Sequence, residues 1–146
     1  MRVVLDTNVL VSGLLWDGPP NQLLKWGRDG MLEIISCEAA VAEAKRVIEY
    51  PKFSRRISAL DISPGQILAY LMNLVTYVPP PTSIPPVIAE DPADDLFLAL
   101  AVENQGCLIV SGDQHLLSLK EHNRIPIVAP GEAVDVINAI RELRTP

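Results

Sequence analysis

The chain has 146 residues, of which 49% are apolar and 21% are charged, and its formal net charge at pH 7 is -6. That length suits a single domain over residues 1–146, able to bury roughly 68–70% of the surface that its unfolded chain would expose. No apolar run approaches the roughly 18 residues of a membrane-spanning helix, and Asp6 interrupts the N-terminal run too early for a signal peptide. We therefore expect a soluble, cytoplasmic protein.

Apolar periodicity in the first half of the chain alternates between strand-like and helix-like patterns, as in α/β proteins with a parallel sheet. Ser36 is the expected cap of a helix that Pro51 ends, because proline disfavours helical geometry in the residue before it. Ser63, Pro64 and Gln66 predict a capping box at the start of another helix. The expected elements, in order, are strand 2–6, helix 9–15, helix 19–28, strand 32–35, helix 36–50, helix 67–74 and strand 75–78.

Residues 79–92 contain six prolines in fourteen positions, which is the one break in composition. Such a run can be an extended linker between domains. We interpret it instead as a stiff crossover on the surface, because the 54 residues after it would make a marginal domain. The expected elements after it are helix 93–105, strand 107–111, helix 116–121, edge strand 125–129 and helix 131–143.

Two cysteines and two tryptophans are expected in the core. Cys37 and Cys107 are too few and too far apart for a disulfide framework or a cysteine zinc site, and small buried residues are their expected role. Trp16 and Trp26 lie in expected helices, where a place in the core is favoured over a place in a partner interface.

Two aspartates follow strand-like runs. Asp6 comes after Val3-Val4-Leu5, and Asp113 comes after Leu108-Ile109-Val110 and a short turn. Ligands of open α/β sheets bind in the crevice outside the carboxyl ends of the strands, so both carboxylates are placed for a ligand site. Each one can equally be a helix cap, and neither residue decides between these interpretations by itself.

Glu43 is a third acid of interest, because its neighbours at three and four residues' distance include Ala39, Ala40 and Val47. A carboxylate on such a largely apolar side of a helix should be partly buried and should need a cation. A metal ion or a surface pair with Arg46 would each meet that need.

The run Asp91-Pro92-Ala93-Asp94-Asp95 precedes an apolar helical pattern. Asp91 as the cap, Pro92 at the first helical position and Asp94 in the first turn together make a strong helix start. One cap does not require three aspartates, however. The surplus of negative charge from Asp94 and Asp95 favours a metal site.

Taken in order, these pieces resemble the PIN-domain family, the nucleases that supply the toxin halves of many prokaryotic toxin-antitoxin pairs of the VapBC type. The resemblance extends over nearly the whole chain. The matching pieces are Val3-Val4-Leu5-Asp6-Thr7-Asn8-Val9-Leu10, Ala42-Glu43, Asp91-Pro92-Ala93-Asp94-Asp95-Leu96-Phe97-Leu98-Ala99-Leu100-Ala101 and Leu108-Ile109-Val110-Ser111-Gly112-Asp113.

The resemblance implies a three-layer α/β/α sandwich around a mainly parallel sheet. It also implies catalytic, metal-binding acids that converge on one or two Mg²⁺ or Mn²⁺ ions, namely Asp6, Glu43, Asp94 and Asp113. Asn8 and Ser111 match polar positions beside the acids and could orient ligands. Asp95 stands where asparagine is frequent in the family, which leaves open which of the adjacent aspartates is the nearer ligand. A homodimer and a small cognate antitoxin are further expectations from the family.

The expected activity is metal-dependent hydrolysis of RNA phosphodiester bonds. Four acids suit a hard cation that binds carboxylate and phosphate oxygens, and the cation lets an acidic protein hold RNA. His115 and His122 have no expected role in this chemistry. A basic stretch could contact RNA beside the acids or could simply be solvated, and its members are Lys45, Arg46, Lys52, Arg55 and Arg56.

Two other functions are compatible with the sequence. A PIN-like module could keep the acidic pocket yet act by capturing a partner, with weak or no nuclease activity. An aspartate-nucleophile phosphatase is the third possibility, prompted by Asp6, but such enzymes generally carry a second aspartate two residues later, where this chain has Asn8.

Overall fold

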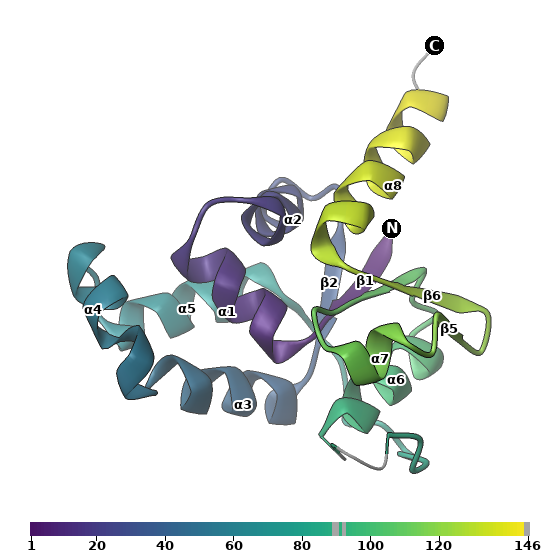
Figure 1. Ribbon diagram of the computed structural model, residues 1–146, viewed down its shortest axis with the longest axis horizontal. Coiled ribbons are helices and arrows are strands. Elements are labelled where there is room, and N and C mark those ends of the chain that lie inside the picture. The colour runs from purple at the N-terminus through teal and green to yellow at the C-terminus, as the bar shows by residue number, and fades with distance from the viewer. Residues whose placement is uncertain (89–90, 92, 145–146) are drawn as a thin grey trace.

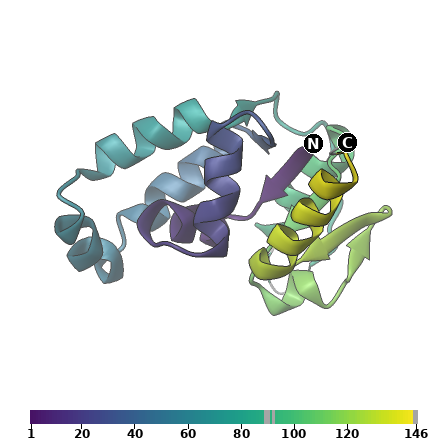
Figure 2. The ribbon, with the colours of Figure 1, turned by 90° about the horizontal axis from the view of Figure 1, so that it is seen from above.

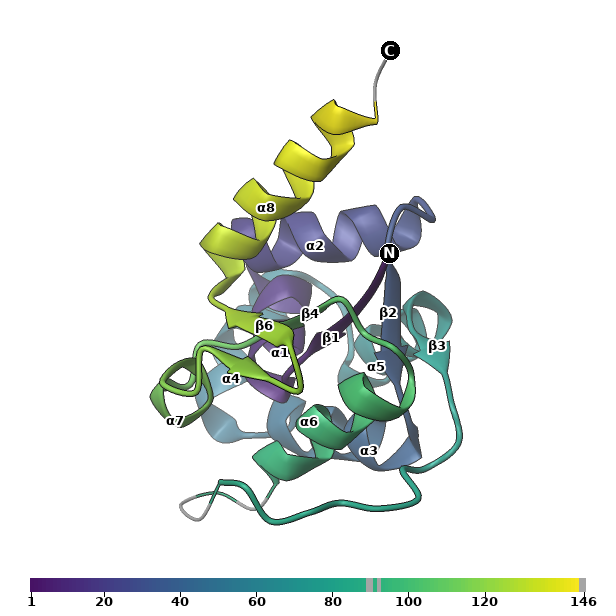
Figure 3. The same cartoon turned by 90° about the vertical axis from the view of Figure 1, so that its right-hand side faces the viewer.

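A six-stranded sheet with the order β3-β2-β1-β4-β6-β5 forms the middle layer of the protein. The structure is a computed structural model, and it describes residues 1–88, 91 and 93–144. In Figure 3, β6, β4, β1, β2 and β3 follow one another from left to right in the order of the sheet. The strands are β1 (Arg2–Leu5), β2 (Glu33–Ser36), β3 (Thr76–Tyr77), β4 (Leu108–Val110), β5 (Glu121–His122) and β6 (Ile125–Val128).

Every strand pair is parallel except β5 with β6. The register places Val3 of β1 opposite Ile34 of β2 and opposite Leu108 of β4. Eight helices surround the sheet among the described residues (Figure 1). They are α1 (Thr7–Leu15), α2 (Pro19–Arg28), α3 (Glu38–Ile48), α4 (Pro51–Ala59), α5 (Pro64–Leu74), α6 (Asp94–Glu103), α7 (Gln114–Leu117) and α8 (Pro130–Leu143).

Side chains of the central strands alternate between two hydrophobic cores, because successive residues of a strand point to opposite faces. Val3 and Leu5 pack with residues of α1, α2, α5 and α8 on one face. Val4 packs with residues of α6 on the other face. The result is a three-layer α/β/α sandwich with a mainly parallel sheet, which confirms the predicted fold class.

Figure 2 shows β1 between the helices of the first half of the chain and the elements that follow α6. A smaller cluster joins α1, α3, α4 and α5, and it contains Val11, Val47 and Ile57. No helix in the described part of the chain is long and apolar enough to cross a membrane.

The start of α3 and the whole of α4 differ from the sequence predictions. Cys37 is the N-cap of α3, whereas the predicted cap Ser36 stays in β2, because its carbonyl accepts a hydrogen bond of 2.9 Å from Val78 N–H. Pro51 does end the preceding helix, but it also occupies the first turn of α4, which the sequence analysis did not predict. Proline ends the first helix because it disfavours helical geometry in the residue before it. It suits the first turn of the next helix because it lacks the N–H that a first turn leaves unbonded.

The segment after α7 was also predicted wrongly. The expected helix over 116–121 gives way to the short helix α7 and then to strand β5, which pairs with β6. Asn123 and Arg124, with φ of 50° and 68°, form the turn between the two strands. Strand β6 therefore lies inside the sheet instead of at its edge, and β5 is the edge strand.

One residue is buried and the other is exposed in both the cysteine pair and the tryptophan pair. Cys37 is buried as predicted, but Cys107 is exposed, so the prediction for Cys107 was wrong. Trp26 is buried in the core, whereas Trp16 is 41% exposed. The Trp16 ring lies edge-on to Phe53 with ring centroids 5.9 Å apart, and the Arg56 guanidinium lies 5.8 Å from its centroid.

Described residues of the proline-rich run have no helix or strand after β3. They follow α6 along one side of the molecule (Figure 3), with Thr82 and Ser83 bonded to Glu103 and with Val87 and Ile88 bonded to Asp95. The described part of the run thus lies on the face of the sheet that α6 covers. The predicted place of Pro92 at the first helical position lies outside the described residues.

Candidate metal centre

Strands β1 and β4 lie side by side at the point where the order of the sheet reverses. From β1 the chain crosses to β2 on one side, and it later returns through α6 to β4 on the other side. Crossovers that diverge from neighbouring strands leave a crevice outside the carboxyl ends of those strands. Asp6 directly follows β1, and Ser111 and Asp113 follow β4, so this crevice is lined with polar groups.

All four predicted acids line one pocket in this crevice. Asp6, Glu43, Asp94 and Asp113 come from four separate elements of the fold. The predicted neighbour Asn8 lines the pocket too. The remaining lining residues are Thr7, Val47, Asp91, Ala93 and Phe97.

The strand side of the pocket is bound together by hydrogen bonds. Asp6 is buried and accepts one bond of 2.9 Å from Val9 N–H and a second, short one from the Ser111 hydroxyl. The Ser111 hydroxyl oxygen in turn accepts a bond of 2.9 Å from Asp113 N–H. Ser111 is fully buried and therefore fixes the two aspartates relative to each other.

Both aspartates also cap helices, as their alternative interpretation required. Asp6 is the N-cap of α1, and Asp113 is the N-cap of α7, where it accepts a bond of 2.6 Å from His115 N–H. Burial raises the pKa of the Asp6 carboxyl; the bonds from Ser111 and Val9 act against this, and the charge of Asp113 adds to it. A cap and a place in the pocket are thus compatible for one residue.

The side of the pocket at the start of α6 is bonded much less. One carboxylate oxygen each of Asp91, Asp94 and Asp113 lies within 4.8 Å of the others. Asp94 is only 7% exposed, and its Oδ2 has no hydrogen-bond partner among the described residues. Burial, followed by the charges of Asp91, Asp113, Asp6 and Asp95, raises the pKa of Asp94 to about 7.

A divalent cation fits this arrangement of oxygens. A buried carboxylate oxygen without a partner is costly, and crowded like charges increase the cost. Hard cations bind carboxylate oxygens and would relieve both effects at once. Asp94 lines a pocket of acids and has a buried Oδ2 without a partner among the described residues, which supports a metal site.

Glu43 lies at the rim of the pocket and is partly buried, with 27% of its side chain exposed. It forms an ion pair with Arg46 on the next turn of α3, so the alternative partner from the sequence is the one observed. Glu43 is outside the close group of three acids. A pair this exposed contributes little to stability, roughly 0–1 kcal/mol, so Glu43 could exchange Arg46 for another cation at a small cost in free energy.

Asp94 and Asp95, the adjacent aspartates, point to different places. Asp94 faces the pocket, whereas Asp95 is not among the residues that line it. The Asp95 carboxylate instead accepts bonds of 3.1 and 2.8 Å from Val87 N–H and Ile88 N–H. Of the two, Asp94 is therefore the one that belongs to the group of acids in the pocket.

Two polar lining residues are absent from the predicted site residues, Asp91 and Thr7. Asp91 was taken as the helix cap, but α6 begins at Asp94 with Ala93 as its N-cap, and Asp91 Oδ1 accepts a bond of 3.1 Å from Ala93 N–H. The Thr7 Oγ1 is buried without a partner among the described residues. Three aspartates within five positions were the available signal for Asp91, while nothing in the sequence singled out Thr7.

The basic stretch begins beside the pocket, where Arg46 pairs with Glu43, and its later members lie farther away. Lys45 and Arg46 lie on α3, and the other three lie on α4, at the end of the molecule opposite β5 and β6 (Figure 1). Arg56 Nε donates a bond of 2.7 Å to the Leu15 carbonyl, and Lys52 lies 5.0 Å from the centroid of the Phe53 ring.

Comparison with known proteins agrees with the geometry. A profile of the PIN domain family matches residues 2–115, which include both strands of the crevice and all the acids of the pocket. No curated protein sequence matches the chain. Residues beyond the match add β5 and β6 to the same sheet. PIN domains are generally nucleases that use divalent metal ions, and this chain belongs to the PIN domain family.

Proposed function

We propose that the protein is a metal-dependent endoribonuclease that hydrolyses RNA phosphodiester bonds with Mg²⁺ or Mn²⁺. The observation that carries this proposal is the buried oxygen of Asp94, which has no partner among the described residues and belongs to an acidic pocket of a PIN domain. One or two ions would be held by Asp94, Asp113 and Asp6, with Asp91 as a further ligand and Glu43 at the rim.

The chain's own groups divide the work of the reaction. When bound, a divalent cation supplies positive charge to the phosphodiester and lowers the pKa of an attacking water. Ser111 holds Asp6 and Asp113 in register through its two hydrogen bonds. The Thr7 hydroxyl, which has no partner within the described part of the chain, and the exposed amide of Asn8 are available to orient water or a phosphate oxygen. Glu43 can join them once it releases Arg46.

Cleavage of RNA by the purified protein, with and without Mg²⁺ or Mn²⁺, tests the proposal. We expect metal-dependent cleavage that chelation abolishes and that Asp6→Asn and Asp94→Asn remove. Asp135→Asn is a matched control, because Asp135 is an exposed acid on α8, away from the pocket. Equal cleavage by the wild type and the two pocket variants would assign the activity to a different site or to a contaminant.

We further infer from the family resemblance that the nuclease is the toxin of a type II toxin-antitoxin pair. A basic group of an antitoxin could occupy the pocket, since Glu43 already accepts a guanidinium. Co-expression with the product of an adjacent small reading frame should give a stoichiometric complex that does not cleave RNA. A complex whose nuclease activity is undiminished would contradict an antitoxin role for that partner.

A second candidate function is a partner-binding module with weak or no nuclease activity. The exposed Trp16, together with Phe53 and Arg56, favours this function, because aromatic and arginine side chains are enriched in protein interfaces. Trp16→Ala should then abolish partner capture while Asp94→Asn leaves it intact. Metal-dependent cleavage by the free protein would decide for the nuclease.

A homodimer, expected from the family, would appear as twice the mass of the chain in light scattering.

A further inference from the structure

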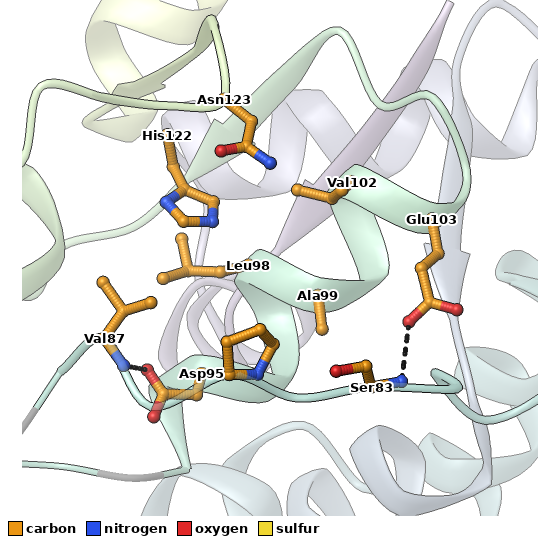
Figure 4. Close-up of a pocket in the computed structure, with 10 residues that line it drawn as sticks. Ser83, Val87, Asp95, Leu98, Ala99, Val102, Glu103, His122 and Asn123 are labelled. Atoms are coloured by element: carbon orange, nitrogen blue, oxygen red, sulfur yellow. Dashed lines mark hydrogen bonds between the residues drawn. The ribbon is translucent and has the colours of Figure 1, made fainter.

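Two carboxylates of α6 hold the proline-rich run at two points, as Figure 4 shows. Near the end of the helix, Glu103 accepts bonds from Thr82 N–H and Oγ1 and from Ser83 N–H, at 2.7–3.3 Å. At its start, Asp95 accepts bonds of 3.1 and 2.8 Å from Val87 N–H and Ile88 N–H. An apolar hollow that includes Leu98, Ala99 and Val102 lies between the two attachments.

The two attachments differ in their surroundings. Glu103 is exposed, whereas Asp95 is only 5% exposed and binds two backbone donors beside the buried side chain of Ile88. Hydrogen bonds to a charged group are stronger where water is excluded, and an unpaired buried donor is costly. The attachment at Asp95 is therefore the firmer of the two.

Asp95 also lies closer along the chain to the metal pocket. Asp91 lies three positions after Ile88 in the sequence, and three residue steps extend at most about 11 Å. Fixing Ile88 thus restricts where Asp91 can go. On its other side, Asp91 is bonded to the start of α6, through Asp94 N–H to its carbonyl at 3.0 Å and through Ala93 N–H to its side chain.

Repulsion between carboxylates would favour a movement of Asp91 out of the pocket if its position were not restricted. The carboxylates of Asp91, Asp94 and Asp113 repel one another, and the charge of Asp91 is the largest electrostatic contribution to the raised pKa of Asp94. Asp113 is fixed by β4 and Ser111, and Asp94 is fixed by the helix. Asp91 precedes the helix and is the one acid of the three that the chain could move away from the others.

We propose that Asp95 is a positioning residue for the metal site. It anchors Val87 and Ile88 and thereby holds Asp91 within reach of the cation that Asp94 and Asp113 bind. The inference rests on the proposed metal site. Because the anchor needs an acceptor oxygen and no negative charge, asparagine at this position should serve as well as aspartate.

Titration of the purified full-length protein with Mn²⁺ in the absence of RNA, followed by calorimetry, tests the proposal. Asp95→Ala should weaken Mn²⁺ binding by about tenfold or more, the usual cost of removing a group that orients a metal ligand. Asp95→Asn should bind nearly as the wild type does. Glu103→Ala is the matched control, because it releases the same run at its other attachment, and it should also leave the affinity unchanged.

A double-mutant cycle separates positioning from a general loss of structure. If Asp95 acts through Asp91, then Asp95→Ala should have no further effect on Mn²⁺ affinity in an Asp91→Ala background. Val87→Pro removes one of the two backbone donors to Asp95 without altering any carboxylate, and it should weaken Mn²⁺ binding. This variant provides a second test of the proposal if Asp95→Ala fails to fold.

The outcomes distinguish this inference from the proposed function. Wild-type protein that binds no Mn²⁺ would remove the metal site, and the inference with it. Tight binding by the wild type with equal affinity in Asp95→Ala and Val87→Pro would overturn the inference alone. So would an undiminished effect of Asp95→Ala in the Asp91→Ala background, or equal losses in Asp95→Ala and Glu103→Ala.

Discussion

The two sides of the metal pocket differ in how completely the protein satisfies their oxygens. On the strand side, Asp6, Ser111 and Asp113 are joined by hydrogen bonds and cap two helices. On the side formed by the start of α6, Asp94 keeps one buried oxygen without a partner among the described residues. If a cation binds here as proposed, the hydrogen-bonded strand side should supply rigidity, and the cation should depend most on Asp94.

The largest effect is therefore expected for Asp94→Asn. The amide keeps the size of the side chain but removes the charge that a hard cation needs. We expect Mn²⁺ affinity and metal-dependent cleavage to fall by roughly a hundredfold or more, the upper range for altering such a site. Calorimetric titration and cleavage assays measure the two effects. An equal or larger loss for Ser111→Ala would show that the strand side matters at least as much for metal binding as the α6 side does.

In the metal-free protein, Asp94→Asn should have the opposite kind of effect, because it should raise the free energy of unfolding. Burial and neighbouring acids raise the pKa of the Asp94 carboxyl from 3.8, its ordinary value, to about 7 in the folded protein. Between these values the folded protein holds a proton that the unfolded chain has lost, so the free energy of unfolding falls as pH rises through that window.

Thermal unfolding between pH 4 and pH 8 measures this dependence. Asp94→Asn should flatten the decline and be more stable than the wild type at pH 8 without metal, since each pKa unit corresponds to about 1.4 kcal/mol. Added Mg²⁺ should stabilise the wild type and leave the variant unchanged. A stability that rises steadily with pH in the metal-free wild type would show that Asp94 is ionised without cost.

A smaller effect is expected on the strand side for Ser111→Ala. The substitution removes the bond to Asp6 and leaves Asp113 N–H without its acceptor, but it removes no metal ligand. Cleavage should fall by about tenfold, the lower range for groups that orient ligands. Ser111→Thr, which restores the hydroxyl, should recover activity. Failure of this rescue would indicate that the small volume at this buried position matters more than its hydrogen bonds.

The strand side was also the part of the site that sequence could predict. Asp6 and Asp113 follow apolar runs, and the carboxyl ends of neighbouring parallel strands meet at one edge whatever the loops do. Asp94 and Asp95 were harder, because adjacent residues of a helix point about 100° apart and only the packed structure decides which faces the pocket. The β5 turn was missed since Asn123 and Arg124 adopt positive φ without a glycine to announce it.

The smallest effect is expected for the part of the basic stretch on α4, because α4 lies away from both sides of the pocket (Figure 1). Arg55→Glu is a cleaner test than a change at Arg56, whose guanidinium bonds to the Leu15 carbonyl and covers Trp16. If α4 extends the RNA-binding surface, Arg55→Glu should weaken RNA binding a few-fold and lower its salt dependence by about one phosphate contact, with Mn²⁺ affinity unchanged. Unchanged RNA affinity over a range of salt concentrations would mean that the stretch is merely solvated, and RNA would then depend on the cation and the residues lining the pocket.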